Sequence, residues 1–219
     1  MDPAADVPTP TGAGRALRPD DGTVDEATVD PDPVAQFARW YGRAADEVEA
    51  PEAMALATAD AAGRPSARMV LLKSWDERGF VFFTNYDGRK SHDLDANPNA
   101  ALLFYWEPLG RQVRIEGSVS RTSDAESDAY YATRDVTSRI GAHASHQSRP
   151  VADRQTLDER VARWAAEFAD GDVPRPSWWG GWRLVPRAFE FWQQGAHRLH
   201  DRVRYEADGP AWTRRRLQP

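Results

Sequence analysis

The sequence contains no cysteine, which excludes disulfide bonds, a thiolate nucleophile and cysteine-ligated zinc. It also lacks any apolar run near the roughly 20 residues that a membrane-spanning helix needs. At the N-terminus no basic segment precedes an apolar stretch, so no secretory signal is expected. These absences predict a cytoplasmic protein that does not enter a membrane.

A basic excess is missing as well, because the formal net charge is −6. Residues 1–33 hold eight acidic and two basic side chains, and the rest of the chain carries 26 of each sign. Nucleic-acid binders typically show a strong positive field, so this balance disfavours that class. No glycine-rich loop follows an apolar strand, which argues against a Rossmann or Walker type of nucleotide site.

Lysine is scarce, since Lys73 and Lys90 stand among 28 basic residues of which the other 26 are arginines. In a chain so biased toward arginine, a retained lysine indicates a place where a compact ammonium on a flexible stem fits and a planar fork does not. We therefore treat both lysines as candidate ligand-binding residues.

What the chain does contain is a series of short strands. Residues 1–31 lack periodicity and are expected to form a mobile tail, followed by one domain over 32–219. Asp32 and Pro33 are typical of the start of a helix, here an amphipathic one. Alternating apolar residues between turn signals predict strands over 53–60, 66–75, 80–85, 100–107, 112–122 and 181–194 and a hairpin over 200–218.

Helices fill the gaps between these strands. A short helix is expected near 91–97, and Ser123 with Glu126 and Thr156 with Glu159 read as two capping boxes that begin further helices. Strands joined by short connections favour an antiparallel arrangement over a parallel α/β sheet. The predicted fold class is mainly β with peripheral helices, either an antiparallel barrel or a sheet.

Two segments carry groups suited to phosphate. In RMVLLK, Arg68 and Lys73 stand at the ends of an apolar strand, and strict alternation places them on opposite faces, where they would meet different anions. In TNYDGRK, Thr84, Arg89 and Lys90 lie in a loop that leads into a helix, and a helix N-terminus adds to such a cradle. The alternative in each case is a solvated surface.

Further polar groups follow along the chain. Tyr130, Arg134 and Ser138 recur at helical spacing and suit a second phosphate, or an ordinary amphipathic surface. Gln112 begins a strand and can bond the edge of a heterocycle, or cap the sheet.

The segment RLHDR, residues 198–202, gathers basic groups. If it is extended, Arg198, His200 and Arg202 share one face. A metal site is not expected, because the two His-x-x-His spacings, at 143–146 and 197–200, lack the glutamate and the helix of a zinc protease.

Several motifs occur in order from about residue 32 to the C-terminus: RMVLLK, TNYDGRK, NPNAALLFYWEPLGRQVRIEG, SRIGAHASHQS, WGGWRLVP, FEFWQQGAHRLHDR and RRLQP. In this order and spacing the chain resembles the pyridoxamine 5′-phosphate oxidase family, FMN enzymes that make pyridoxal 5′-phosphate. The resemblance implies a split β-barrel homodimer with FMN at the subunit interface. It implies oxidation of pyridoxamine or pyridoxine 5′-phosphate, with hydride passing to the flavin and O2 reduced to H2O2.

The resemblance also assigns residues to roles. It gives catalytic positions over the pyridine ring to Arg198 and His200. It gives FMN contacts to Arg68, Met69, Val70, Leu71, Leu72, Lys73, Phe83, Thr84, Arg89, Lys90, Gln112, Gln147, Ser148, Trp192 and Arg202. It gives substrate contacts to Lys73, Tyr130, Arg134, Ser138, Arg198, Leu199 and His200.

Three positions depart from the family pattern. The N-terminal segment offers Arg18 but no tyrosine, Ala50 replaces an aspartate before the first barrel strand, and His143 replaces a tryptophan in GAHAS. Because the first of these concerns the lid over the substrate, two alternatives stay open. One is a related FMN oxidase of another aromatic substrate, such as a phenazine precursor, and the other is a non-catalytic FMN or pyridoxal phosphate binding protein.

Overall fold

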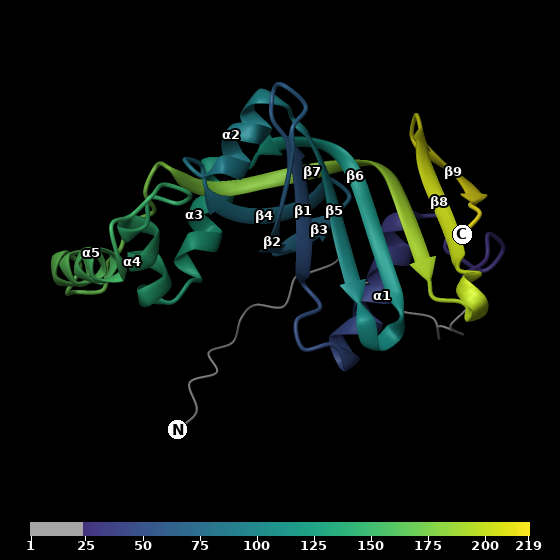
Figure 1. Cartoon of the computed structure of the whole chain (residues 1–219), viewed down its shortest axis with the longest axis horizontal. Coiled ribbons are helices and arrows are strands. Elements are labelled where there is room, and N and C mark those ends of the chain that lie inside the picture. Colours follow the sequence, from purple (N-terminus) through teal and green to yellow (C-terminus); the bar gives the residue numbers. More distant parts are fainter. Residues whose placement is uncertain (1–23) are drawn as a thin grey trace.

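Antiparallel strands dominate the computed structural model, which describes residues 24–219 (Figure 1). Over these residues nine strands form one sheet in the order β2-β1-β5-β6-β7-β4-β3, with β8 pairing β7 and β9 pairing β8. The predicted fold class is confirmed. The strands are β1 (Ala53–Ala59), β2 (Pro65–Leu71), β3 (Ser74–Asp76), β4 (Gly79–Asn85), β5 (Asn99–Trp106), β6 (Arg111–Arg121), β7 (Trp179–Gln193), β8 (Asp201–Asp208) and β9 (Ala211–Arg216).

The long strand β7 divides the sheet into two parts. Along one edge it pairs with β6 over its length, and along the other it pairs first with β4, at 179–184, and then with β8, at 188–193. Pro186 lies between the two partners, and the register with β6 shifts between Glu116 and Gly117. A bulge of this kind bends a strand and increases its twist. The sheet therefore curls and splits, with α3 and α4 at one end and β8 and β9 at the other (Figure 1).

Five helices lie around the sheet in the described part of the chain: α1 (Pro33–Glu47), α2 (Arg89–Ala96), α3 (Asp124–Ala132), α4 (Val136–Ala144) and α5 (Arg154–Glu167). Asp32 caps α1 as predicted, by accepting from the Val34 amide at 2.9 Å. The capping box expected at Thr156 is wrong, because α5 begins one turn earlier and Asp153 accepts from the Thr156 amide at 2.7 Å. No helix within 24–219 combines the length and apolar character needed to cross a membrane.

Helix α1 closes the core of the sheet with aromatic side chains. Phe37 is fully buried and meets the rings of Trp75, Phe80 and Phe104 at centroid distances of 5.0 to 5.3 Å. Edge-to-face packing of such rings adds to the free energy of burying their area. The apolar stripe predicted for this helix is therefore its attachment to the sheet.

Packed structure begins before residue 32. The tail expected over 1–31 lies partly outside the described residues, at 1–23, but residues 24–31 pack onto β8 and β9. Val24 and Val29 are 1% and 5% exposed, and Tyr205 donates to the Asp30 carbonyl at 2.7 Å. The expectation of a mobile tail is wrong for 24–31. The two valines stand in a polar stretch without periodicity, so no local pattern indicates this packing.

Candidate active site

One cavity of about 710 Å³ lies between β2, β4 and the helices α3 and α4. Its walls bring together residues that the sequence assigned separately to a flavin and to a substrate. Twelve of these residues line it: Arg68, Met69, Val70, Leu71, Lys73, Phe83, Thr84, Lys90, Tyr130, Arg134, Ser138 and Gln147. Strands β2 and β4 supply Arg68–Leu71, Phe83 and Thr84, helices supply Lys90, Tyr130 and Ser138, and loops supply the rest. The cavity is therefore a junction between the sheet and its peripheral helices.

The first pair of cations in the cavity is Arg68 with Lys90. The Lys90 ammonium is 8% exposed and donates to Thr84 Oγ1 at 3.0 Å and to Gln147 Oε1 at 2.6 Å. Burial, with a smaller contribution from the positive charge of Arg68, lowers the pKa of Lys90 to about 8. Neutral oxygens alone hydrogen-bond this ammonium, and an anion would complete its environment.

The Arg68 guanidinium is held by contacts with β1 and α2. Its Nη1 donates to Thr58 Oγ1 at 2.8 Å and to the Leu56 carbonyl at 3.0 Å, and its Nη2 lies 3.6 Å from Asp93 Oδ2. These contacts fix the plane of the guanidinium before any ligand binds. Such preorganisation reduces the entropy lost on binding.

The second pair is Lys73 with Arg134. Burial lowers the pKa of the Lys73 ammonium, Glu52 opposes this, and repulsion by Arg134 adds to it. Burial also lowers the pKa of Arg134, and its buried Nη1 has no hydrogen-bond partner among residues 24–219. A buried donor without a partner is costly, so this atom marks a place for an acceptor. The cavity thus holds two separate positions for anions.

The sequence placed Arg68 and Lys73 on opposite faces of one strand, where they would meet different environments. The part about opposite faces is wrong, because both line the same cavity, whereas the expectation that they meet different anions stays a prediction. The predicted strand over 66–75 is interrupted: β2 ends at Leu71, Leu72 turns into the core, and β3 begins at Ser74. Side-chain alternation does not continue through this break. The cavity therefore receives cations from both ends of the RMVLLK segment.

An aromatic stack forms one wall. Phe83 lies parallel to Tyr130 at a centroid distance of 4.0 Å and to Trp179 at 5.5 Å. Trp179 was given no role by the sequence analysis, although it starts a motif that was noted, WGGWRLVP. Thr133, Asp135, Asn85, Gly141, Ala142 and Ser145 also line the cavity and were missed. These residues belong to no motif of their own, so they give no signal until the fold brings them together.

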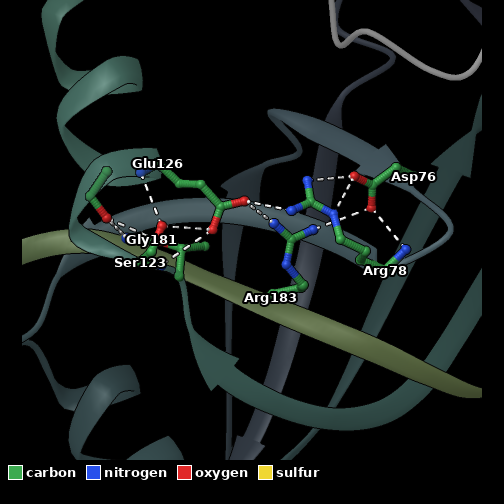
Figure 2. A network of polar contacts seen from close by, with 8 residues as sticks. Asp76, Arg78, Ser123, Glu126, Gly181 and Arg183 are labelled. Carbon is green, nitrogen blue, oxygen red and sulfur yellow. Dashed lines mark hydrogen bonds and ion pairs between the residues drawn. The ribbon is translucent and has the colours of Figure 1, made fainter.

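The N-terminus of α3 is fixed by a charged network (Figure 2). Ser123 Oγ accepts from the Glu126 amide at 3.2 Å, and Glu126 Oε2 accepts from the Ser123 amide, which completes the predicted capping box. Glu126 Oε1 accepts from Arg183 at 2.6 Å and pairs with Arg78 at 3.2 Å. Asp76 bonds both of these arginines. The network joins α3 to β3 and β7, which sets the other end of the helix against the cavity.

Three more predicted residues form a smaller pocket of about 190 Å³ on the sheet. Gln112, Trp192 and Arg202 line it together with Glu190. The Glu190 carboxylate is 5% exposed and binds Arg202 Nη2 at 2.7 Å. Glu190 also bonds Arg114, so its charge holds two guanidinium groups in place. In the single chain this pocket is separate from the large cavity.

The RLHDR segment is not extended throughout, and the expectation of a shared face for Arg198, His200 and Arg202 is wrong. His197 and Arg198 have φ values of 55° and 63°, and β8 begins at Asp201. Two successive non-glycine residues in this region make a tight turn at a cost that proteins accept mainly at functional sites. Gly195 permits the turn, because a Cβ there would lie 1.9 Å from the Leu199 carbonyl oxygen.

The turn presents polar groups to solvent. Arg198 is exposed, and Leu199 is 70% exposed. His200 Nδ1 accepts from the Gly195 amide at 3.2 Å, which leaves Nε2 as the protonated nitrogen of the neutral ring. The ring lies 4.6 Å from Trp192. Arg198, Leu199 and His200 are absent from the lining of the large cavity of the same chain.

The remaining predicted residues lie beside the site. Leu72 is fully buried in the core, so its side chain cannot contact a ligand. The Arg89 amide donates to Ser148 Oγ at 3.2 Å, which ties the start of α2 to the segment after α4. Gly88 precedes this helix, and a Cβ there would lie 2.5 Å from Gln147 Oε1. The absence of a side chain at residue 88 therefore leaves room for Gln147 beside Lys90.

The His-x-x-His spacings form no cluster of metal ligands within 24–219. His143 instead packs between Trp164 and Phe168 at centroid distances of 4.9 and 5.0 Å, and its Nε2 lies 2.8 Å from the Pro174 carbonyl. It thereby takes the position of an aromatic core residue between α4 and α5.

Comparison with known proteins identifies the family of the chain. Residues 42–167 match a family model described as pyridoxamine 5′-phosphate oxidase, and 179–219 match its C-terminal dimerisation region. A pyridoxine/pyridoxamine 5′-phosphate oxidase of Rubrobacter xylanophilus is 55% identical over 195 residues, which are 89% of this chain and 90% of the relative. One of Paraburkholderia phymatum is 55% identical over 200 residues, covering 90% and 94%.

Solved structures show the same fold. PhzG from Burkholderia lata, solved with tetrahydrophenazine-1-carboxylic acid, aligns with a TM-score of 0.83 at 36% identity over 88% of this chain and 95% of its own. An FMN-binding protein of Nostoc punctiforme aligns with a TM-score of 0.66 at 16% identity, covering 84% and 95%. On the strength of the family matches and the 55% identity, the chain belongs to the pyridoxine/pyridoxamine 5′-phosphate oxidase family.

Proposed function

We propose that this protein is a cytoplasmic homodimeric oxidase that uses FMN to convert pyridoxamine or pyridoxine 5′-phosphate into pyridoxal 5′-phosphate. The observation that carries the proposal is the presence of two separate cation pairs in one cavity of about 710 Å³. This reaction brings together two ligands that each carry a phosphate. A site with one cation pair would suit the cofactor or the substrate, but not both.

The residues of the first pair fit FMN. Arg68 and Lys90 present two positive charges beside the Thr84 hydroxyl and the Gln147 amide, and no carboxylate neutralises Lys90 among the described side chains. A phosphate with two negative charges matches this donor set. When bound, FMN supplies the acceptor for a hydride from the substrate and passes the electrons to O2, giving H2O2.

The second pair fits the phosphate of the substrate. Lys73 and Arg134 repel each other in a partly buried wall, and Tyr130 and Ser138 add hydroxyl groups nearby. Binding a phosphate removes this repulsion and gives the buried Arg134 Nη1 a partner. The remote phosphate then anchors the substrate ring, so that its reacting carbon is held close to the cofactor.

The second subunit completes the site in this proposal. Arg198 and His200 lie in the turn before β8, away from the cavity of their own chain, and the dimer would bring them over the cavity of the partner. His200 Nε2 then donates a hydrogen bond, and Arg198 adds a positive charge near the substrate oxygen. Both groups act by orienting the ring and stabilising negative charge.

An exposed apolar face supports the dimer. Met69, Leu103 and Tyr105 are 64%, 36% and 54% exposed, and Met69 and Leu103 both pair with Ala55, which puts them on one face. This face lies between the large cavity, which Met69 lines, and the smaller pocket, which Leu103 lines. Contiguous apolar surface of this kind typically marks an interface. A second copy that covers it would join the two half-sites.

The test is turnover by the purified protein after loading with FMN. We expect O2 consumption and formation of pyridoxal 5′-phosphate from both vitamin B6 phosphates. A second candidate function is favoured by the 36% identity to PhzG, whose structure holds a tetrahydrophenazine carboxylic acid. Oxidation of that compound without turnover of either B6 phosphate would support this second function and refute the first.

A further inference from the structure

Arg134 is a phosphate ligand in the proposed function, and the structure shows an unusual way of holding it. The guanidinium carbon lies 4.7 Å from the centroid of the Trp179 ring and 5.6 Å from that of Tyr131. No carboxylate forms an ion pair with Arg134 in residues 24–219. Asp135 attracts it from the next position in the chain, but the Asp135 carboxylate caps α4 by accepting from the Ser138 amide at 2.8 Å.

Contact with a ring in place of a carboxylate leaves the Arg134 guanidinium able to bind an anion. A carboxylate would orient the guanidinium but would also neutralise it and occupy its donors. The face of an indole attracts a cation through its quadrupole and leaves the N–H groups at the edge free. Arg134 accordingly keeps its charge, and its buried Nη1 keeps an open donor.

Trp179 is itself firmly fixed. It is 7% exposed, it stacks on Phe83 at an interplanar angle of 9°, and its carbonyl accepts from Arg175 Nη1 at 2.8 Å. Arg175 also donates to Asp124 at 2.8 Å and to Asp128 at 2.6 Å, and both belong to α3. One arginine therefore ties the backbone of Trp179 to the helix that precedes Arg134.

We propose that Trp179 is a positioning residue for the substrate phosphate. Its ring holds the Arg134 guanidinium in the orientation that binds phosphate and does not neutralise its charge. The inference rests on the proposed function. It extends that function by naming a residue that acts on the phosphate through another side chain. A ring with a π face should preserve this action, and an apolar side chain without one should not.

The experiment compares W179F and W179L in the FMN-loaded enzyme, with W212L as the matched control. Trp212 packs on Phe189 at a centroid distance of 5.4 Å and lies on β9, at the other end of the sheet from α3 (Figure 1). KM and kcat are measured with pyridoxine 5′-phosphate, and the Kd of inorganic phosphate is measured by competition with the product. FMN content and melting temperature are recorded for each variant.

We expect W179L to raise KM and the phosphate Kd by about tenfold, which corresponds to about 1.4 kcal/mol, with a smaller change in kcat. W179F should stay within about threefold of the wild type, and W212L should leave both constants unchanged. When Arg134 is already replaced by glutamine, W179L should add less than about twofold, because no guanidinium remains to be held. Equal effects of W179F and W179L, or a full effect in the R134Q background, would overturn the proposal.

Two further outcomes are also informative. If W179L does not fold, W179M supplies the same comparison, because it is unbranched and apolar and adapts to irregular packing. If the wild type does not oxidise either B6 phosphate, the proposed function fails. In that case the phosphate Kd of W179L against W179F still decides whether Trp179 positions Arg134.

Discussion

Replacing Lys90 with methionine should change folding stability and FMN affinity in opposite directions. The Lys90 ammonium is 8% exposed, and burial together with Arg68 lowers its pKa from 10.5 to about 8. This lowering corresponds to about 3 kcal/mol by which the folded protein disfavours the charged form. The hydrogen bonds to Thr84 and Gln147 offset part of it, at about 1 kcal/mol each.

The sign follows from proton linkage. Below pH 8 the folded and unfolded chains both carry the ammonium, so the full penalty acts on folding. Between pH 8 and 10.5 the folded chain loses its proton first, and stability rises with pH over that window. At pH 7, K90M removes the penalty and the two hydrogen bonds, for a net gain of about 1 kcal/mol. In a chain of this size that gain raises the melting temperature of the FMN-free protein by about 2–4 °C.

FMN binding should weaken in the same variant. A charge-assisted hydrogen bond to phosphate is worth about 1.5–3 kcal/mol, so K90M should raise the Kd of FMN by about 10- to 150-fold. The wild-type Kd should also rise above pH 8 as Lys90 loses its proton. The Kd of K90M should stay flat from about pH 7 to 9, where a phosphate monoester already carries two charges.

Fluorescence titration of FMN and thermal melts of the FMN-free protein measure both quantities. The control is R64M, since Arg64 is exposed in the turn between β1 and β2 and pairs with Asp60. That variant should match the wild type in both assays. A melting temperature lower by more than about 4 °C in K90M, with FMN Kd within about twofold of the wild type, would refute the assignment of Lys90 to a phosphate.

Three other predictions test separate parts of the account. Removing 1–31 should cost about 3–6 kcal/mol in a urea melt, because two core valines leave with it, whereas removing 1–23 serves as the comparison that keeps both. Equal urea melts of the two truncations would show that residues 24–31 contribute nothing to stability. R198A should lower kcat by at least about tenfold with FMN content unchanged, and loss of flavin in that variant would contradict a role on the substrate side. E190Q should destabilise the protein by about 1–3 kcal/mol and weaken FMN binding through Arg202; an unchanged flavin Kd would exclude that link.

The sequence predicted elements wherever a local pattern decides the structure. Asp32 and Pro33 begin α1, and the alternation of Gln112 and Val113 along β6 matches the buried and open faces of the sheet. These elements depend on capping and on side-chain period, which are properties of neighbouring residues. The order of the motifs likewise predicted the family, because the series of motifs extends over most of the chain.

Tertiary contacts decided what the sequence did not predict. The break between β2 and β3 turns Lys73 into the cavity of Arg68, and only the surrounding sheet reveals it. The left-handed turn at Arg198 depends on a close approach between Gly195 and Leu199. Trp179 gains its role from partners on β4 and α3, far away in the chain. The first and third cases depend on residues distant in the chain, and the second on a close backbone approach; periodicity within one segment encodes neither.

Anaerobic mixing of the FMN-loaded protein with pyridoxine 5′-phosphate tests the central claim most directly. The proposed function predicts that the visible absorbance of the flavin bleaches on mixing and returns when air is admitted, with pyridoxal 5′-phosphate as the product. A flavin that stays oxidised with both B6 phosphates would contradict the assigned substrate. A protein that retains no flavin would contradict the assignment of Arg68 and Lys90 to the FMN phosphate.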